Sequence, residues 1–197
     1  MPIHPFRTYI TAYTPLASME WESIEACLNR REYPKQSLLL QEGRICRKLY
    51  FLENGLLRYF INRDGREVTK YFTVPPYCFT SQRSFTLQQA ATESIETMEK
   101  SVVWEMGRDD AFRLLQTNSS WNNFVRLLVQ EVQFYTENIL EQLQNQTAEE
   151  RYVEMIKEGN VLLERVPLKY LASYLGIAPQ SLSRIRKRFH QRRQNLT

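Results

Sequence analysis

The stretch Val166-Pro-Leu-Lys-Tyr-Leu-Ala-Ser-Tyr-Leu-Gly-Ile-Ala-Pro-Gln-Ser-Leu-Ser-Arg-Ile-Arg-Lys-Arg188 determines how the C-terminal part of this chain folds. Pro167 suits the first turn of a helix, Gly176 allows the left-handed turn that ends it, and Pro179 begins a second helix. Apolar residues recur at helical spacing in both segments: Leu168, Leu171, Ala172 and Leu175 in the first, Leu182, Ile185 and Phe189 in the second. The small Ala172 falls where the two helices would cross closely, so the pattern predicts a helix-turn-helix.

Polar side chains of the second helix are expected to point away from its apolar positions. Gln180, Ser181 and Arg184 lie at its N-terminal end, the part of a recognition helix that enters the major groove of DNA. Glutamine can pair with adenine and arginine with guanine through two hydrogen bonds each. Candidates for phosphate contacts are Lys169, Ser183, Arg186, Lys187 and Arg188. We therefore expect binding to double-stranded DNA, and the alternative is a helical hairpin with a solvated basic surface.

The charge distribution agrees with a polyanionic partner for this region. The chain of 197 residues carries a net charge of +4. Residues 147–197 contain ten Lys or Arg and five Glu, whereas residues 1–146 are close to neutral. From Arg184 onward there are six basic residues and no acid. A basic module on a near-neutral body is typical of proteins that bind nucleic acid.

Composition excludes several other classes of protein. Hydrophobic residues make up 43% of the chain, enough for a packed core, and no apolar run approaches the roughly 20 residues of a membrane helix. The N-terminus lacks the apolar core of a signal peptide. Three widely spaced cysteines, Cys27, Cys46 and Cys78, form neither a disulfide framework nor a metal motif, so we expect a reducing cytoplasm. With only His4 and His190 in the chain, a histidine-based metal site is not expected, and no cofactor is predicted.

The segment from Pro34 to Met106 has the character of an antiparallel β domain. Short apolar runs alternate with tight-turn signals, of which Asn54-Gly55 and Asp64-Gly65 supply the positive φ of hairpin turns. The predicted strands are 49–52, 56–61, 67–73, 94–100 and 101–106. Many short strands at this spacing favour a barrel or jelly roll. A short helix over residues 15–30 is expected to precede them.

Residues 121–146 contain neither Gly nor Pro and carry a heptad-like apolar stripe. The positions of this stripe are Trp121, Val125, Leu128, Val132, Tyr135 and Ile139. β-branched residues at one core position and Leu at the other favour two-stranded pairing, so we expect a dimer seam here. A helix buried inside a monomer is the alternative. A second apolar edge, expected to pack on the β domain, consists of Phe124, Leu127, Phe134 and Leu143. Thr147 and Glu150 then form a capping box that starts the next helix.

This order of elements resembles the Crp/Fnr family of bacterial transcription regulators, most closely over Val166–Arg188. Looser similarities lie at Glu42-Gly43, at residues 50–55 and at residues 64–67. The resemblance covers about residues 20–190 and looks most like a Bacteroidetes branch of the family. It implies an α+β fold with an N-terminal antiparallel β-roll or jelly-roll domain of the cyclic-nucleotide-binding type, a long dimerisation helix and a C-terminal (winged) helix-turn-helix.

The resemblance also implies a domain division and a set of partners. Residues 1–120 would form the sensor domain, residues 121–146 the dimerisation helix and residues 147–197 the DNA-binding domain. The partners would be an inverted repeat of double-stranded DNA and a second copy of the chain, with RNA polymerase as a further candidate. Neither a membrane nor a particular small-molecule effector is implied.

The sequence departs from cyclic-AMP-binding members of the family in the nucleotide pocket. Those members hold the ribose and phosphate with a Gly-Glu pair and an Arg-Ser/Thr pair, whereas residues 75–85 and 90–94 lack the glutamate and carry no Arg before Thr92. We therefore expect no cyclic-nucleotide binding. A small anion is a candidate ligand for the polar loop Thr80, Ser81, Gln82, Arg83 and Ser84, with an ordinary surface loop as the alternative. The scattered cysteines argue against an iron–sulfur cluster, while haem ligation stays open.

Two functions from other classes are alternatives to DNA binding. A cupin-type metalloenzyme needs clustered His and Glu on its strands, and no His lies between residues 5 and 189, so an enzyme is not expected. The other is a ligand-binding or protein-interaction β-roll whose helix-turn-helix is degenerate. Arg184 and the acid-free C-terminal segment argue against it. The sequence therefore favours a sequence-specific, DNA-binding transcription regulator.

Overall fold

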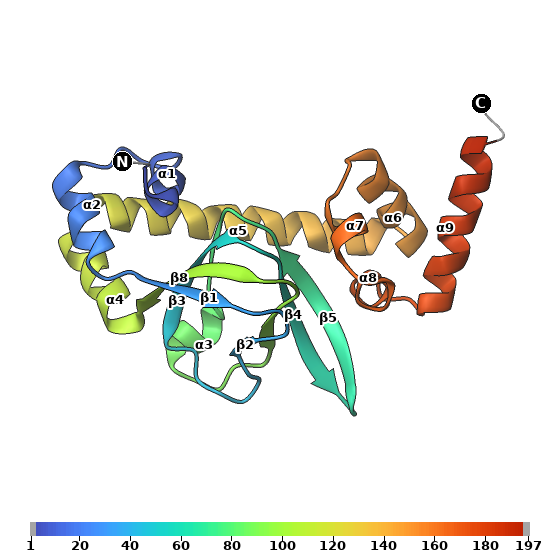
Figure 1. The fold of residues 1–197 in the computed structure, drawn as a ribbon, viewed down its shortest axis with the longest axis horizontal. Coiled ribbons are helices and arrows are strands. Elements are labelled where there is room, and N and C mark those ends of the chain that lie inside the picture. Colours follow the sequence, from blue (N-terminus) through green and yellow to red (C-terminus); the bar gives the residue numbers. More distant parts are fainter. Residues whose placement is uncertain (1–2, 195–197) are drawn as a thin grey trace.

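A computed structural model describes residues 3–194 of the chain. Helices α1 (Pro5–Thr11) and α2 (Ser18–Glu25) come first, and eight strands follow within the described residues. Helix α3 (Gln82–Leu87) interrupts the strands, and α4 (Arg108–Thr117) follows the last of them. Figure 1 shows the β domain beside the long helix α5 (Ser119–Asn145), with the C-terminal helices at one end of the molecule.

Two four-stranded antiparallel sheets form the β domain. One sheet has the order β1 (Asn29–Tyr33), β8 (Ser101–Gly107), β3 (Lys48–Asn54), β6 (Tyr77–Phe79). The other has the order β2 (Leu38–Leu40), β7 (Ser94–Thr97), β4 (Leu57–Arg63), β5 (Arg66–Thr73). The β4–β5 hairpin turns at Asp64 and Gly65, which both have positive φ, as their turn signal predicts. The predicted class, a β-roll followed by a long helix, is confirmed.

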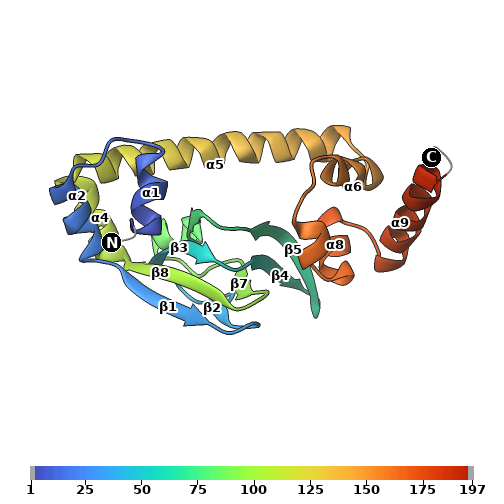
Figure 2. The ribbon, with the colours of Figure 1, turned by 45° about the horizontal axis from the view of Figure 1, so that its top comes forward.

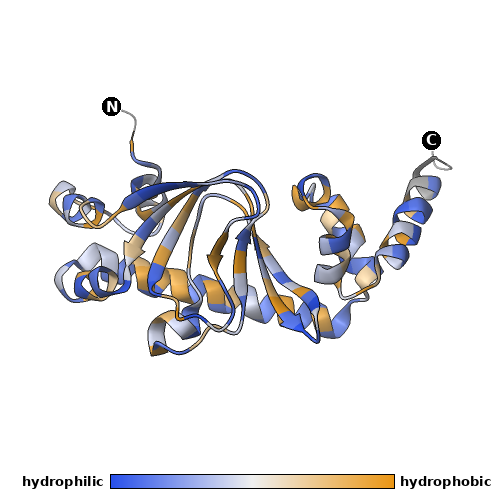
Figure 3. Cartoon of the chain, turned by 60° about the horizontal axis from the view of Figure 1, so that its bottom comes forward, coloured by the Kyte–Doolittle hydropathy of each residue, from blue (hydrophilic) through white to orange (hydrophobic). Residues whose placement is uncertain are grey.

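Large aromatic side chains join the β domain to the helices that cover it. Phe51 of β3 stacks on Phe6 of α1 with 4.6 Å between ring centroids, and Phe6 meets the ring of Trp121 of α5 edge-on at 6.2 Å. All three side chains are buried in one cluster. Figure 3 shows apolar and polar residues interleaved along the strands, and apolar residues on α5. The N-terminal helix, the β domain and the first half of α5 therefore share a single core.

Several elements of the N-terminal half differ from the prediction. The helix predicted over residues 15–30 covers only α2, because the chain from Asn29 is already paired with β8. β1 consists of Asn-Arg-Arg-Glu-Tyr, four of whose side chains are exposed, so it has no alternation that a sequence pattern can reveal. The strand predicted over residues 94–100 ends at Thr97. Helices α1, α3 and α4 were not predicted.

The start of α5 is anchored to α2 by a carboxylate. Asn118 caps the helix, because its Oδ1 accepts a hydrogen bond from the backbone N–H of Trp121 at 2.8 Å. Glu20 of α2 accepts hydrogen bonds from Ser120 Oγ at 2.6 Å, Ser119 Oγ at 2.9 Å and the Ser120 N–H at 3.1 Å. These donors, the Ser120 hydroxyl first, lower the pKa of Glu20 to about 2.

We expect this anchor to make folding stability depend on pH in the acid range. Because the folded-state pKa lies below the usual value of 4.5, the contribution of ionised Glu20 is complete above that pH. It is lost as the pH falls toward 2. The difference in Tm between the wild type and Glu20→Gln should therefore shrink over this range, whereas Glu22→Gln, at an exposed neighbour, should show no such trend. Thermal unfolding followed by circular dichroism gives these Tm values. A Tm difference between the wild type and Glu20→Gln that does not change with pH would contradict this role.

Part of the predicted dimer seam lies in the core of the protomer. Trp121 and Leu128 are 0% and 8% exposed and belong to the cluster beneath the helix, so they are not free to contact a second copy. Phe124 packs there as predicted. Phe134 and Leu143, predicted to pack on the β domain, are instead 62% and 54% exposed.

Besides Phe134, Tyr135 and Leu140, which are exposed apolar side chains outside it, α5 carries a second heptad-like row of accessible, mostly apolar side chains, which we call the α5 stripe. It consists of Val125, Val129, Val132, Thr136, Ile139 and Leu143. This row keeps Val125, Val132 and Ile139 of the predicted seam. Trp121 and Leu128 are excluded because they are buried, whereas Tyr135, at 52% exposed, remains accessible next to Thr136 of the row. The core of the protomer therefore takes residues from both predicted apolar edges of the helix, all of them in its first half.

The C-terminal segment, in its described part at residues 147–194, consists of helices joined by short turns. It comprises α6 (Ala148–Lys157), α7 (Leu162–Arg165), α8 (Leu168–Leu175) and α9 (Pro179–Gln194). The predicted capping box is present, since Thr147 Oγ1 accepts from the Glu150 N–H at 3.2 Å and Glu150 Oε2 accepts from the Thr147 N–H at 2.8 Å. These described residues contain no strand that could serve as a wing. None of the helices in residues 3–194 has the length and apolar character needed to span a lipid bilayer.

Candidate nucleic-acid interface

Helices α8 and α9 form the predicted helix-turn-helix. Gly176 ends α8 with a φ of 74°, and the N–H of Ile177 donates to the Ala172 carbonyl at 3.0 Å, which closes the turn. Ala172 and Leu182 are 0% exposed and lie in one buried cluster with Leu171, Leu175 and Ile185. The small residue therefore stands at the helix contact where the sequence predicts it.

Helix α6 supports this pair through a contact that the sequence pattern did not reveal. Arg151 Nη2 donates a hydrogen bond to the carbonyl of Leu175 at 2.9 Å. That carbonyl belongs to the last turn of α8, whose acceptors have no partner within the helix. Tyr152 and Met155 of α6 add apolar contacts to the same cluster. The three helices α6, α8 and α9 thus form one packed unit.

The outer face of α9 carries a row of exposed polar side chains, which we call the α9 stripe. It consists of Gln180, Arg184, Lys187 and Arg188. Two of the three predicted base-reading residues, Gln180 and Arg184, belong to it, and the third, Ser181, is half-buried. Figure 1 shows α9 at one end of the molecule, running across the direction of α5. The helix therefore presents this face to a partner that approaches from the end of the molecule.

The predicted phosphate contacts differ in their surroundings. Lys169 and Lys187 are exposed, whereas Ser183 and Arg186 are half-buried. Arg188 Nη2 forms an ion pair with Glu149 of α6 at 2.7 Å, so a phosphate would compete with a carboxylate for this guanidinium. The side chains of His190, Arg192 and Arg193, and residues 195–197, lie outside the described part of the chain.

The polar loop predicted as an anion site is largely a helix with inward-facing hydroxyls. Ser81 precedes α3, and Gln82, Arg83 and Ser84 belong to it. Thr80 Oγ1 donates to the Lys48 carbonyl at 2.9 Å, and Ser84 Oγ accepts from the Cys46 N–H at 2.8 Å. Only Gln82 and Arg83 remain exposed. The hydroxyls predicted to bind a ligand are therefore occupied by the protein itself.

A buried carboxylate occupies the interior of this region. Glu93 is 7% exposed and accepts a hydrogen bond from Ser81 Oγ at 2.8 Å. Lys70 Nζ of β5 lies 2.5 Å from its other oxygen. The serine and lysine that could hold an anion thus already hold the Glu93 carboxylate, and a bound phosphate would stand beside a negative charge.

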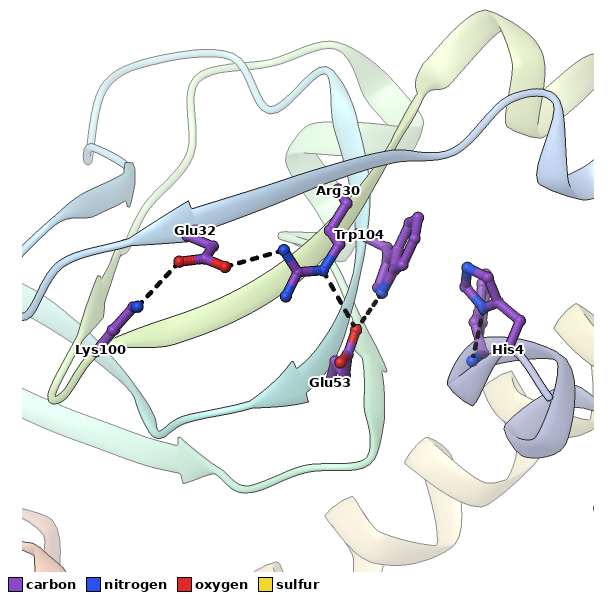
Figure 4. Close-up of polar contacts among 7 residues, drawn as sticks. His4, Arg30, Glu32, Glu53, Lys100 and Trp104 are labelled. Carbon is purple, nitrogen blue, oxygen red and sulfur yellow. Dashed lines mark hydrogen bonds and ion pairs between the residues drawn. The ribbon is translucent and has the colours of Figure 1, made fainter. Parts of the chain in front are cut away.

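Polar residues also gather where β1, β3 and β8 meet the N-terminus (Figure 4). Trp104 Nε1 donates to Glu53 at 2.6 Å, and Glu32 pairs with Arg30 at 2.9 Å and with Lys100 at 3.0 Å. The sixth labelled member of the group, His4, accepts from the backbone N–H of Phe6 at 3.1 Å and so caps α1. Burial lowers the pKa of His4. These contacts hold strands and a helix together, and within residues 3–194 no group of three His, Cys, Asp or Glu is placed to bind a metal ion.

Comparison with known proteins finds a match to one domain family and a set of fold relatives. Residues 30–118 match the family model of the cyclic nucleotide-binding domain, and no curated protein matches the sequence. A protein from Eubacterium rectale assigned to the Crp/Fnr family is similar over 92% of this chain and 88% of its own, with a TM-score of 0.70 and 17% identity. FixK2 from Bradyrhizobium japonicum covers 84% and 85%, with a TM-score of 0.70 and 17% identity. The c-di-GMP-responsive global regulator CLP from Xanthomonas campestris covers 89% and 92%, with a TM-score of 0.68 and 18% identity. At these identities the likeness establishes a shared fold.

Proposed function

We propose that the protein is a homodimeric, sequence-specific DNA-binding transcription regulator, because residues 30–118 match the cyclic nucleotide-binding domain family and the chain has the fold of Crp/Fnr-type regulators. The observation that carries this proposal is the α8–α9 helix-turn-helix, whose second helix presents the α9 stripe at one end of the molecule. A buried cluster fixes the opposite face of α9, so the stripe has a defined direction.

Each residue of the interface takes a role that suits its chemistry and exposure. Gln180 and Arg184 read base edges in the major groove, the first through adenine and the second through guanine. Ser181 stands next to them as a shorter hydrogen-bonding group. The phosphate contacts fall to Lys169, Ser183, Arg186, Lys187 and Arg188, and these hold the protein on the duplex without selecting a sequence.

The α5 stripe supplies the second contact that this function requires. Two parallel copies of α5 would bury their stripes against each other and place the two α9 helices at the same end of the dimer. A two-fold dimer matches an inverted repeat, with half-site centres about 10–10.5 base pairs apart or a multiple of that spacing. In the protomer Val129, Val132 and Leu143 are 40–54% exposed. This pairing would bury them.

Selection of random DNA duplexes by the purified protein tests the proposal. At about 150 mM salt, where non-specific electrostatic binding is weakened, an inverted repeat should be enriched. Binding without any enriched sequence and without salt dependence would favour the competing function, an interaction module with a degenerate helix-turn-helix. The same selection without added small molecules also shows whether an effector is needed.

Cyclic AMP should not bind to the β domain. Glu93 already pairs with Lys70 and accepts the Ser81 hydroxyl, so the cyclic phosphate would meet a carboxylate in place of a cation. Isothermal titration of the full chain with cyclic AMP should give only the heat of dilution. A saturable heat with one site per protomer would show that Glu93 moves aside and that this interpretation of the pocket is wrong.

A further inference from the structure

The C-terminal helices are fastened to the β domain through α8. Figure 2 shows α8 next to β4 and β5, with α9 beyond it. Leu56 and Met98 of the β domain belong to the same buried cluster as Leu171 and Leu175 of α8. Phe72 of β5 also meets the ring of Tyr174 at 5.7 Å. The helix-turn-helix and the β domain therefore share an apolar contact whose two sides come from different parts of the chain.

A fully buried arginine lies within this contact. The side chain of Arg58 on β4 is 0% exposed. Its guanidinium carbon lies 4.2 Å from the ring centroid of Phe60 and 3.9 Å from that of Tyr170. Phe60 belongs to β4 and Tyr170 to α8, so the cation contacts one ring from each side of the interface. A cation at this distance is attracted to an aromatic face, the more so when both are shielded from water.

The remaining surroundings of Arg58 come from the β domain alone. Glu67 accepts a hydrogen bond from Nη2, and Glu96 Oε1 lies 2.9 Å from Nη1. Arg58 Nε has no hydrogen-bond partner in residues 3–194. Tyr170 is thus the residue through which α8 shields a buried charge that is only partly satisfied. Such a charge tolerates little displacement of its neighbours, because losing them leaves it desolvated and unpaired.

Two polar contacts hold α8 and the segment before it in the same place. β5 is an edge strand, and the N–H of its Thr69 donates to Ser173 Oγ of α8 at 2.9 Å. Ser173 lies three residues after Tyr170, on the same face of the helix. Arg165, just before α8, donates to the carbonyl of Gly55 at 2.8 Å and pairs with Glu99 at 2.5 Å. The strand edge and the helix are therefore joined at several points around Arg58.

We propose that Arg58 is a positioning residue, which through Tyr170 fixes the direction of α8, and with it α9, relative to the β domain. In a dimer the direction of α9 in each protomer sets the separation of the two α9 stripes. Arg58 therefore controls which half-site spacing the protein accepts. The control of half-site spacing rests on the proposed function, whereas the role of Arg58 in holding α8 in place within one protomer does not.

A distance measurement within the protomer tests the fixing of α8 without DNA. Spin labels are attached to the full chain at Lys35→Cys in the β domain and Lys187→Cys on α9, both exposed positions; the three native cysteines are buried. Pulsed electron paramagnetic resonance should give a narrow distance distribution for the wild-type background. Arg58→Met should broaden it, and Arg30→Met, which removes a β-domain arginine paired with Glu32, should not.

A second variant keeps the test decisive if Arg58→Met does not fold. Tyr170→Leu leaves the arginine in place and removes the ring that α8 contributes, and it should broaden the distribution in the same way. A distribution as narrow as that of the wild type in either folded variant would overturn the proposal. The measurement depends neither on DNA nor on knowledge of an effector.

Operator spacing provides the functional readout. Duplexes with two selected half-sites are prepared with the spacing changed in steps of one base pair. The wild type should have one optimal spacing. For Arg58→Met, the ratio of the affinity at that spacing to the affinity at other spacings should be about tenfold smaller, a change within the usual range of coupling between sites. Its affinity for a single half-site should stay unchanged. An equal loss of affinity at every spacing would overturn the positioning role, and a wild-type protein that selects no duplex would refute the proposed function while leaving the distance measurement valid.

Discussion

Val132→Asp is expected to convert the dimer into monomers and to lower operator affinity about a hundredfold or more. Val132 lies in the middle of the α5 stripe and is 40% exposed in the protomer. In the proposed dimer it faces its counterpart, so the substitution places two carboxylates in an apolar seam. Burying such charges without partners costs several kcal/mol, and about 2.7 kcal/mol already corresponds to a hundredfold change in affinity.

Light scattering and DNA titration check this expectation together. The mass should fall to that of one chain, and the circular dichroism spectrum should stay unchanged because the side chain does not belong to the core of the protomer. Asn138→Asp, an exposed position about 120° around the helix from Val132, should leave mass and affinity as in the wild type. A dimeric Val132→Asp protein would show that the seam runs along another face.

Arg184→Ala should cost about 1–3 kcal/mol of binding free energy on the selected operator, a loss of about five- to 150-fold in affinity. Arg184 is exposed in the α9 stripe, one helical turn from Gln180, and its Nε lies 3.5 Å from the Gln180 carbonyl. Arg184 is expected to read a guanine. On operators in which that one base pair is changed, the wild type and Arg184→Ala should therefore bind with equal affinity. Affinity measurements on all four variants of that base pair test this.

Lys187→Ala serves as the comparison for a phosphate contact. It belongs to the same exposed row, and its loss should weaken binding by a similar factor on every sequence. It should also reduce the slope of log affinity against log salt by about one. If Arg184→Ala behaves in this manner too, Arg184 touches the backbone and does not select a base.

The helix-turn-helix was predictable from sequence because its signals are local. Gly176, Ala172 and the apolar positions lie within a single stretch, and the structure places them where the pattern does, except for Phe189, which is half-buried and does not belong to the cluster. The same holds for the Thr147–Glu150 capping box and for the hairpin turn at Asp64-Gly65. In these places one short segment decides its own conformation.

Features that depend on distant partners could not be predicted in this way. β1 has no apolar alternation and exists because β8 pairs with it. The side of α5 that faces the core is chosen by Phe6 and the β domain, so Trp121 was assigned to the wrong face. No local sequence pattern marks Arg58 as buried, because the ring that covers it belongs to Tyr170, more than a hundred residues away in the chain.

Because the α5 stripe is short, operator occupancy should depend steeply on the concentration of the protein. From Val125 to Leu143 the row is about 27 Å long, and it includes Thr136 among its six positions. In the proposed dimer, such a seam is small enough for protomers to separate at low concentration. Below the dissociation constant of the dimer, the concentration of dimer rises with the square of the protomer concentration, so a doubling of expression raises operator occupancy about fourfold. Gene dosage would then serve as an input signal, with no metabolite required.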